Sequence, residues 1–475
     1  MPHADRPQTY EPRTDELRIY SATSFVGHGV DEESVERALS YGVHAIVAQG
    51  TTTDAGPYYL GTGKPVMAEE ALRCDLEIIV CSAHKAGVPF IVSAGGSGSD
   101  LSTALSLRII ADICRECGLR LKVGVVWSEI DPDWLVDRIA GGVEARRIVP
   151  ALRLEERLSC ETVKKCKRIV AQVGPEVVMR LLSANPGLDG VLCGRALDVG
   201  LYAALPLMHG FDKGLSMHFG KIMEDGSLAA TPGSGNDGLL GIIRKDHFDV
   251  MPMSPKRRCT PESVVGHAFY ERSDPSREAN PGGALDISGS TYVQLDDRTV
   301  RVTGSGWVPD PEYRVKLEGV TRIGYRSVCI AGVRDPQFIR NVDVILDECR
   351  EIVCHYFRTL PAGSYTLTFR VYGRDAVLGA CEPVPVVEGH EICILIDVVA
   401  DSQQRADSIC SFTSSTVSHH GFPGRLSTAG NLAMPFSPGR AISVGEVYQF
   451  SVWHALPLED PCEPFRTEVV SLPGE

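Results

Sequence analysis

The strongest constraint on the fold is a pattern that repeats between residues 17 and 193, where short apolar runs alternate with amphipathic helices. The runs expected to form strands are Leu17–Phe25, His44–Ala48, Val88–Val92, Leu121–Trp127, Ile169–Val173 and Gly190–Cys193. Near-continuous apolar strands between amphipathic helices are typical of a parallel sheet that is covered on both faces. We therefore expect an α/β fold with a mostly parallel sheet flanked by helices.

The intervening helices are marked by apolar spacing and by their ends. Apolar residues fall at helical spacing over Leu72–Ala83, and Gly87 is placed to end that helix. A second helix is expected over Leu101–Cys117. A third is expected to begin at Pro175, because proline is favoured in the first turn of a helix.

The texture of the sequence changes after Ala284, where the expected strands become alternating and turn-rich, and again at residues 360–363. We expect a polar tail over residues 1–16, an α/β domain over 17–360 and a smaller α+β domain over 361–475. A subdivision of the α/β domain near residue 285 is also compatible with the pattern.

Composition excludes several classes of protein. The net charge of −14 argues against a nucleic-acid partner, because an acidic surface repels phosphate, although a few local arginines still allow a small anionic metabolite to bind. No apolar run approaches the ~20 residues that span a bilayer, and the N-terminal segment lacks the apolar core of a signal peptide. We therefore expect a cytoplasmic protein without a membrane partner. The 15 scattered cysteines, among them Cys74, Cys114, Cys193 and Cys354, favour reduced and buried thiols over a disulfide framework.

Three loops follow expected strands, and ligands bind at the carboxyl ends of strands in open α/β sheets. In the loop Gln49–Gly63, Asp54 is suited to act as a base, and Tyr58 or Tyr59 as a proton donor or oxyanion contact. Thr53 adds a hydroxyl to this site. The alternative interpretation is a long structural loop with a Pro-Tyr turn.

The second loop runs from Ser93 to Asp100 and precedes a helix. The residues expected to bind a carboxylate or phosphate there are Ser93, Gly95, Gly96 and Ser97. The alternative is a simple helix cap by Ser99 or Asp100. The loop lacks both the G-x-G-x-x-G spacing and the Gly-Lys-Ser/Thr of a P-loop, so no nucleotide cofactor is expected.

The third loop contains Arg195 and Asp198 and directly follows the strand that ends at Cys193. Arg195 is suited to clamp a carboxylate with Asp198 beside it, or the two residues form an ion pair at the start of the next helix.

Other candidates lie further along the chain. His267, Tyr270 and Glu271 share a helix that begins near Pro261, and His267 and Glu271 are suited to move protons or simply pack there. Arg326 and Arg334 are candidate substrate-binding residues, although Arg334 also suits an ion pair with Asp335. We predict no metal site: the adjacent His419 and His420 point oppositely on an extended chain, and the Cys114–Cys117 pair has no second pair to complete a zinc site.

Motifs along the whole chain resemble the acyclic terpene utilisation (AtuA) family. The segments with this resemblance are Asp54-Ala-Gly-Pro-Tyr-Tyr-Leu-Gly61, Gly194-Arg195-x-x-Asp198, Pro281-Gly-Gly-x-Leu-Asp286, Lys316-Leu-Glu-Gly319, Gly324-Tyr-Arg326, Gly332-x-Arg-Asp335 and Gly430-Asn-Leu-Ala-x-Pro-Phe-Ser-Pro438. The resemblance implies an AtuA-like N-terminal domain followed by a ferredoxin-like C-terminal domain. It implies acyclic terpene degradation through acyl-CoA intermediates, or action on small branched dicarboxylic acids. The chain departs from the pattern at Gln49 and Thr51, where an acidic residue and a glycine are expected.

The leading hypothesis is a lyase of the hydratase or dehydratase type, or a related double-bond isomerase, that acts on a small polycarboxylate without a redox or nucleotide cofactor. Such an enzyme must hold carboxylates and move one proton. We expect a homodimer or higher homo-oligomer. The alternatives are an enzyme of acyl-CoA metabolism and a non-catalytic subunit that binds a metabolite.

Overall fold

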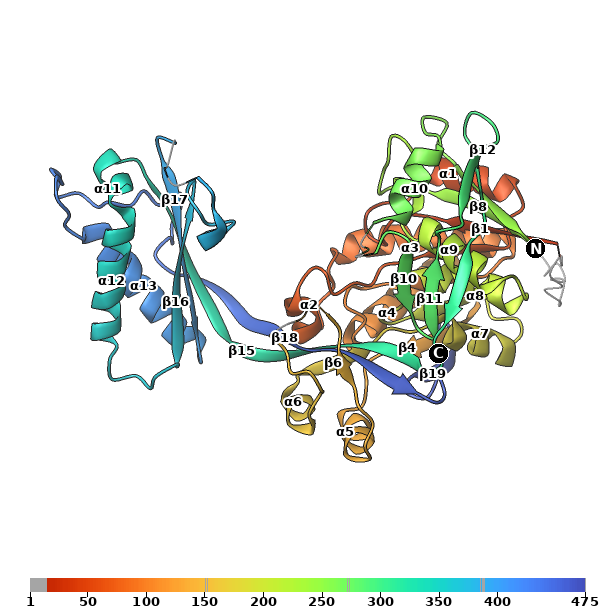
Figure 1. Ribbon diagram of the computed structural model, residues 1–475, viewed down its shortest axis with the longest axis horizontal. Coiled ribbons are helices and arrows are strands. Elements are labelled where there is room, and N and C mark those ends of the chain that lie inside the picture. The colour runs from red at the N-terminus through yellow and green to blue at the C-terminus, as the bar shows by residue number, and fades with distance from the viewer. Residues whose placement is uncertain are drawn as a thin grey trace. The chain divides into compact units, whose positions relative to one another are not determined.

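The computed structural model describes residues 15–149, 151, 153–270, 272, 274–384, 386 and 389–474. These residues form two compact units. The first runs up to Thr321 and resumes at Phe450, and the second is Arg322–Gln449. The chain passes between the units within two long strands, β15 (Tyr313–Val333) and β18 (Ile442–Leu458) (Figure 1). The second unit therefore begins before the expected boundary at residue 361. It ends before the C-terminus, because strand β19 (Arg466–Leu472) pairs with a strand of the first unit.

The first unit is built on a ten-stranded sheet in the order β12-β13-β9-β8-β1-β2-β3-β7-β4-β19. Besides β19, its strands are β1 (Glu16–Ser21), β2 (Ala45–Ala48), β3 (Phe90–Ser93), β4 (Leu121–Trp127), β7 (Gly190–Cys193), β8 (Leu239–Arg244), β9 (His247–Pro252), β12 (Thr291–Gln294) and β13 (Val300–Thr303). The pairings from β1 through β2, β3 and β7 to β4 are parallel. The outer pairings on both sides are antiparallel.

The α/β class is thus confirmed, but the expectation of a mostly parallel sheet is wrong, because the sheet is mixed. Hairpins β8–β9 and β12–β13 extend one side, and β19 closes the other. The expected strand near residue 169 forms as β6 (Arg168–Ala171), but it pairs antiparallel with Leu317–Val320 of β15 instead of joining the large sheet.

Helices cover both faces of the large sheet, as the sequence predicts. The helices of this unit are α1 (Glu32–Ser40), α2 (Pro57–Thr62), α3 (Glu69–Ala86), α4 (Asp100–Cys117), α5 (Pro132–Ala140), α6 (Cys160–Lys165), α7 (Pro175–Ala184), α8 (Asp198–Met208), α9 (Lys213–Met223), α10 (Pro261–Ala268) and the short η1 (Gly226–Ala229). Successive strand residues point to opposite faces. Ile46 accordingly packs in one apolar cluster with α1, α3 and α4, whereas Ala45 and Val47 pack in another with α7, α8 and α9.

Smaller elements complete the first unit. A three-stranded sheet contains β10 (Arg277–Asn280), β11 (Gly283–Asp286) and β14 (Gly306–Pro309), and the short strand β5 (Arg146–Arg147) pairs with β18 at His454 and Ala455. The described cysteines are free thiols, as expected. Cys114 and Cys193 are buried as expected, but the expectation of burial is wrong for Cys74 and Cys354, which are exposed.

The second unit follows β15 with two helices, a hairpin and a third helix. Its elements are α11 (Pro336–Arg340), α12 (Val342–Tyr356), β16 (Tyr365–Tyr372), η2 (Gly379–Cys381), β17 (Ile392–Ala400) and α13 (Gln403–His419), followed by the first part of β18. The sheet order within this unit is β16-β17-β15-β18, and α12 and α13 pack on it around an apolar cluster that includes Ile345 and Ile409 (Figure 1). Across the described parts of both units, no helix has the length and apolar character needed to cross a membrane.

Candidate functional site

The three loops named from the sequence meet at the carboxyl ends of β2, β3 and β7, which are parallel neighbours in the large sheet. Thr51 joins them. It forms a β-bridge with Gly96, its Oγ1 donates to the carbonyl of Gly194 at 3.2 Å, and its carbonyl accepts from Arg195 at 2.9 Å. The three loops that the sequence analysis grouped therefore lie together at one edge of the sheet.

Arg195 and Glu318 form a buried ion pair beneath these loops, with side chains only 4% and 0% exposed. Arg195 Nε donates to Glu318 Oε2 at 2.8 Å, while Lys316 Nζ and Thr53 Oγ1 donate to Oε1 at 2.8 and 2.9 Å. Burial alone would raise the pKa of Glu318. The charges and hydrogen bonds of Arg195 and Lys316 outweigh burial and lower this pKa to about 2. At neutral pH Glu318 is thus an anion, and it fixes Arg195.

The donors of Arg195 are mostly committed to the protein. Nη1 donates to the carbonyls of Thr51 and Ala196, and Nη2 reaches Glu318 Oε1 at 3.4 Å. With Nε, these bonds use four of the five N–H groups of a guanidinium. Nη1 also lies 3.8 Å from Asp198 Oδ1. Arg195 therefore holds the loops together. Its ion pair with Asp198 is the one that the sequence analysis gave as the alternative to binding a substrate carboxylate.

The loop Ser93–Asp100 is packed against its surroundings. Ser93 Oγ accepts from the amide of Gly50 at 2.9 Å, and the amide of Gly96 donates to the Gly50 carbonyl at 3.2 Å. Ser99 is the N-cap of α4 and accepts from the amide of Ser102. Gly95 and Gly96 both have positive φ. Ser97 is buried, and its hydroxyl has no hydrogen-bond partner among the described residues.

The loop Gln49–Gly63 is more open. Asp54 is exposed, and its Oδ2 accepts from Thr52 at 2.9 Å. Tyr58 and Tyr59 lie on α2 with their rings edge to face, and Lys64 Nζ donates to the Tyr58 hydroxyl at 3.1 Å. These residues lie toward solvent from the buried ion pair.

A second group of polar residues lies beside Asp198, and we call it the acid–base cluster. Its members are Gln49, Asp198, Lys221, Glu224, Asp225 and His267. Lys221 Nζ donates to Glu224 Oε1 at 2.6 Å, and both side chains are at least nine-tenths buried. Gln49 Nε2 donates to Asp225 Oδ1 at 3.2 Å. One donor atom from each of Glu224, Asp225 and His267 lies within 4.8 Å of the others.

His267 is held as a neutral ring. Burial and the charge of Lys221 lower its pKa to about 4, although a hydrogen bond to the backbone of Lys221 acts in the opposite direction. Its Nε2 is buried, makes no hydrogen bond among the described residues, and lies 3.8 Å from Asp225 Oδ2. The ring also stacks with Tyr270, which lies beyond the end of α10 at Ala268, so the prediction that Tyr270 shares the helix of His267 is wrong. The free nitrogen therefore faces a carboxylate.

Asp198 is the acid of the cluster best suited to exchange a proton at neutral pH. Burial raises its pKa to about 7; Arg195 opposes the rise, and the charges of Asp225, Glu318 and Asp54 add to it. Its Oδ1 has no hydrogen-bond partner in the described part of the chain. The side chain as a whole is partly buried, at 29% exposed, and perturbed carboxyl groups in such surroundings are frequent at catalytic sites.

The helix that carries His267 begins with a capping box. The hydroxyl of Thr260 accepts from the amide of Ser263, and the hydroxyl of Ser263 accepts from the amide of Thr260. We expect Thr260→Ala to lower the free energy of unfolding by about 1 kcal/mol in chemical denaturation, because one capping bond is lost. Thr260→Ser keeps the hydroxyl and should match the unchanged protein. Equal stability of all three forms would contradict a role for the cap.

The remaining candidates lie elsewhere. Arg326 and Arg334 belong to the second unit, where Arg326 Nε donates to Asp397 Oδ1 at 2.9 Å and Arg334 is exposed. Glu271 lies outside the described residues.

Sequence reasoning missed Lys221, Glu224 and Asp225, and it treated Gln49 only as a departure from a family pattern. The available signal was the pair of adjacent acids, Glu224 and Asp225, that directly follows Ile222 and Met223. Nothing in the local sequence tells that α9 ends beside His267.

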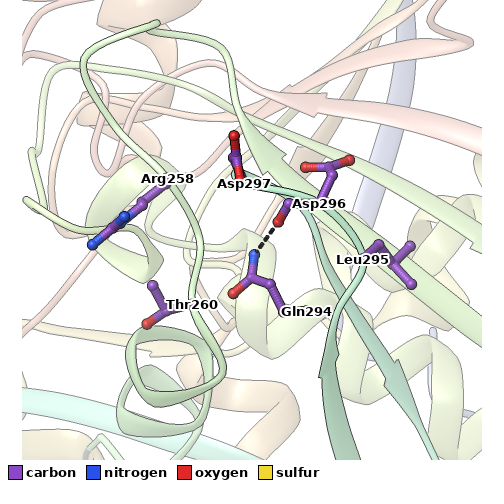
Figure 2. Close-up of a pocket in the computed structure, with 6 residues that line it drawn as sticks. All are labelled: Arg258, Thr260, Gln294, Leu295, Asp296 and Asp297. Atoms are coloured by element: carbon purple, nitrogen blue, oxygen red, sulfur yellow. Dashed lines mark hydrogen bonds between the residues drawn. The ribbon is translucent and has the colours of Figure 1, made fainter.

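A pocket of about 270 Å³ lies at the opposite end of α10 from His267 (Figure 2). Arg258, Thr260, Gln294, Leu295, Asp296 and Asp297 line it. Gln294 donates to the carbonyl of Asp296, and Asp296 accepts from the amides of Arg298 and Thr299. Because these side chains hold the β12–β13 turn together, we do not place the functional site there.

Comparisons with known proteins identify no relative: no family model, curated protein or solved structure matches the chain.

Proposed function

We propose that the protein is an enzyme of the hydratase or dehydratase type, or a related double-bond isomerase, that acts on a small polycarboxylate. The observation that carries the proposal is the acid–base cluster. Asp198, with a pKa of about 7, and His267, with a free Nε2, lie beside the carboxyl ends of the parallel strands. General acid–base catalysis is most effective when the pKa of the group is near the working pH.

In this proposal Asp198 moves the proton on the carbon next to a carboxylate, because a pKa of about 7 lets it both accept and return that proton. His267 remains neutral at pH 7 because of its low pKa, so its Nε2 lone pair is available to a group bound in the cluster. The proton transfer needs no redox or nucleotide cofactor. The substrate class follows from the resemblance to the AtuA family, which we include in the proposal.

We also propose that the second unit is the ferredoxin-like domain of that family. Its order of elements supports this assignment: strand, helix, two strands, helix and strand, when α11 and the short η2 are set aside. The antiparallel pairing of β17 with both β15 and β16 is consistent with it.

Turnover of unsaturated acids tests the proposed function. The protein is incubated with unsaturated di- and tricarboxylic acids, with and without divalent metal, while the ultraviolet absorbance of the double bond is followed. We expect turnover, and we expect Asp198→Asn to lower kcat by about 100-fold or more, because a general acid–base group contributes about 10²–10⁴-fold. The control is Asp347→Asn, which changes a carboxylate that is 76% exposed on α12 and should leave kcat unchanged. Absence of turnover with every such acid would count decisively against the proposal.

A further inference from the structure

The donor atoms of Glu224, Asp225 and His267 are arranged as ligands of one cation would be. Glu224 is the C-cap of α9, Asp225 follows it, and His267 lies in the last turn of α10. Their donor atoms lie within 4.8 Å of one another. Ligand atoms that bind a tetrahedral cation at about 2.1 Å lie about 3.4 Å apart, so side-chain shifts of up to about 1 Å would close the site.

His267 supplies an observation that is independent of the acids. Its side chain is only 7% exposed, and its Nε2 faces Asp225 at 3.8 Å without a hydrogen bond among the described residues. The backbone of Lys221 holds the ring by a separate hydrogen bond. A metal-binding histidine is oriented in this way, with one nitrogen tied to a carbonyl and the other free for the cation.

Gln49 adds a second unpartnered atom at the same place. Its Nε2 donates to Asp225 and to the carbonyl of Ser24 at 2.6 Å, which fixes the amide, while its buried Oε1 has no partner in the described part of the chain. The glutamine also explains the departure at this position. A carboxylate at residue 49 would repel Asp225, whereas an amide binds it and offers a neutral oxygen.

The charges of the cluster favour a cation. Two adjacent carboxylates, Glu224 and Asp225, share the cluster with the ammonium of Lys221, which bonds to Glu224 Oε1 at 2.6 Å. Carboxylates gathered in a partly buried site attract either protons or a cation. An imidazole among carboxylate oxygens selects a divalent transition metal over Ca²⁺, which prefers oxygen ligands alone.

We propose that Glu224, Asp225 and His267 bind one divalent transition-metal cation, with Gln49 Oε1 as a further ligand. The cation neutralises the acid–base cluster. Where the proposed function holds, it also binds a carboxylate of the substrate, which the cluster would otherwise repel.

Metal binding to the full chain tests this site without an assay of activity. After treatment with a chelator and its removal, the protein is titrated with Mn²⁺ and with Zn²⁺ in a calorimeter, and the melting temperature is recorded at each concentration. We expect one cation per chain and a rise in the melting temperature, because a ligand that binds only the folded state stabilises it. Ca²⁺ should bind at least 10-fold more weakly.

Two variants locate the cation. Asp225→Asn keeps an acceptor for Gln49 and removes one charge, and His267→Phe keeps a ring against Tyr270 and removes Nε2. Each should weaken Mn²⁺ and Zn²⁺ binding by about 100-fold. The matched control is His420→Ala, because His420 pairs with a single carboxylate, Glu348, at 2.7 Å and should not affect binding.

The outcomes of these titrations distinguish failure of the cation site from failure of the proposed function. Absence of stoichiometric uptake by the unchanged protein at millimolar Mn²⁺ and Zn²⁺ would overturn the site, whether or not a variant folds. Uptake that is equal in Asp225→Asn and the unchanged protein would place the cation elsewhere and also overturn it. Cation binding without turnover of any polycarboxylate would instead refute the proposed function and leave the cation site standing.

Discussion

Replacing Glu318 with glutamine is expected to lower the free energy of unfolding by about 3–5 kcal/mol, the largest loss that we predict for a single side chain. The substitution leaves Arg195 charged and 4% exposed without its anion. It also removes the charge that Lys316 contacts. Removing one partner of a buried ion pair has this cost because the remaining charge stays desolvated. Urea denaturation, followed by the fluorescence of the tryptophans, measures the difference.

The control for this prediction is Asp460→Asn. Arg180 makes two hydrogen bonds to Asp460 at 2.7 and 2.8 Å, so its geometry matches a strong pair, but the two side chains are 57% and 47% exposed. Exposed pairs contribute about 0–1 kcal/mol, and we expect a loss in that range. Similar losses for both variants would show that burial of the Arg195–Glu318 pair is not the cause.

Glu318 also predicts a pH dependence. Its pKa is about 2 in the folded chain and near 4.5 without the fold, so the unfolded chain takes up the proton first as the pH falls. The stabilisation by Glu318 is therefore complete above about pH 4.5 and is lost toward pH 2. Glu318→Gln should lack this part of the acid dependence and should show a flatter stability profile between pH 5 and 2 (about one titrating group in slope). An unchanged profile would contradict the assignment.

Gly98→Ala is expected to be the second most damaging change, with a loss of about 3 kcal/mol or more. Gly98 has φ +74°, and a Cβ placed there would lie 2.0 Å from the amide nitrogen of Arg195 and 2.4 Å from its Cα. Those are backbone atoms of a buried residue, so they cannot move aside. Ser128 Oγ ties the same two residues together, since it donates to the Gly98 carbonyl at 2.7 Å and accepts from the Arg195 amide at 2.6 Å. Overpacking and the left-handed backbone both contribute to the loss.

Gly118→Ala separates those two contributions. Gly118 is the C-cap of α4, the helix that begins two residues after Gly98. It has φ +66°, but a Cβ there meets nothing within 4 Å. Only the left-handed conformation is penalised, at about 1–2 kcal/mol. Thermal or urea unfolding of both variants gives the comparison. A loss for Gly98→Ala no larger than that for Gly118→Ala would mean that the loop can move away from Arg195.

Much of the local structure could be predicted, because helices and strands depend on the spacing of apolar residues and on the residues that begin and end each helix. The predicted strands Leu121–Trp127 and Gly190–Cys193 form with these bounds. The predicted helix over Leu101–Cys117 begins one residue earlier, at Asp100. Strand pairing was less predictable. A strand that pairs with its neighbour in a hairpin and one that follows a crossover helix can have the same composition, and only their tertiary contacts differ.

The sequence by itself determined the α/β class and the edge of the sheet where the polar loops meet. Those properties follow from apolar periodicity and from the rule that parallel strands point their carboxyl ends the same way. Only the tertiary structure decided which polar groups became partners. Arg195 and Glu318 are 123 residues apart, and Gln49 reaches Asp225 across 176 residues. The physical reason is that an ion pair or a shifted pKa depends on burial and on distances through space, and neither is encoded in the spacing of residues along the chain.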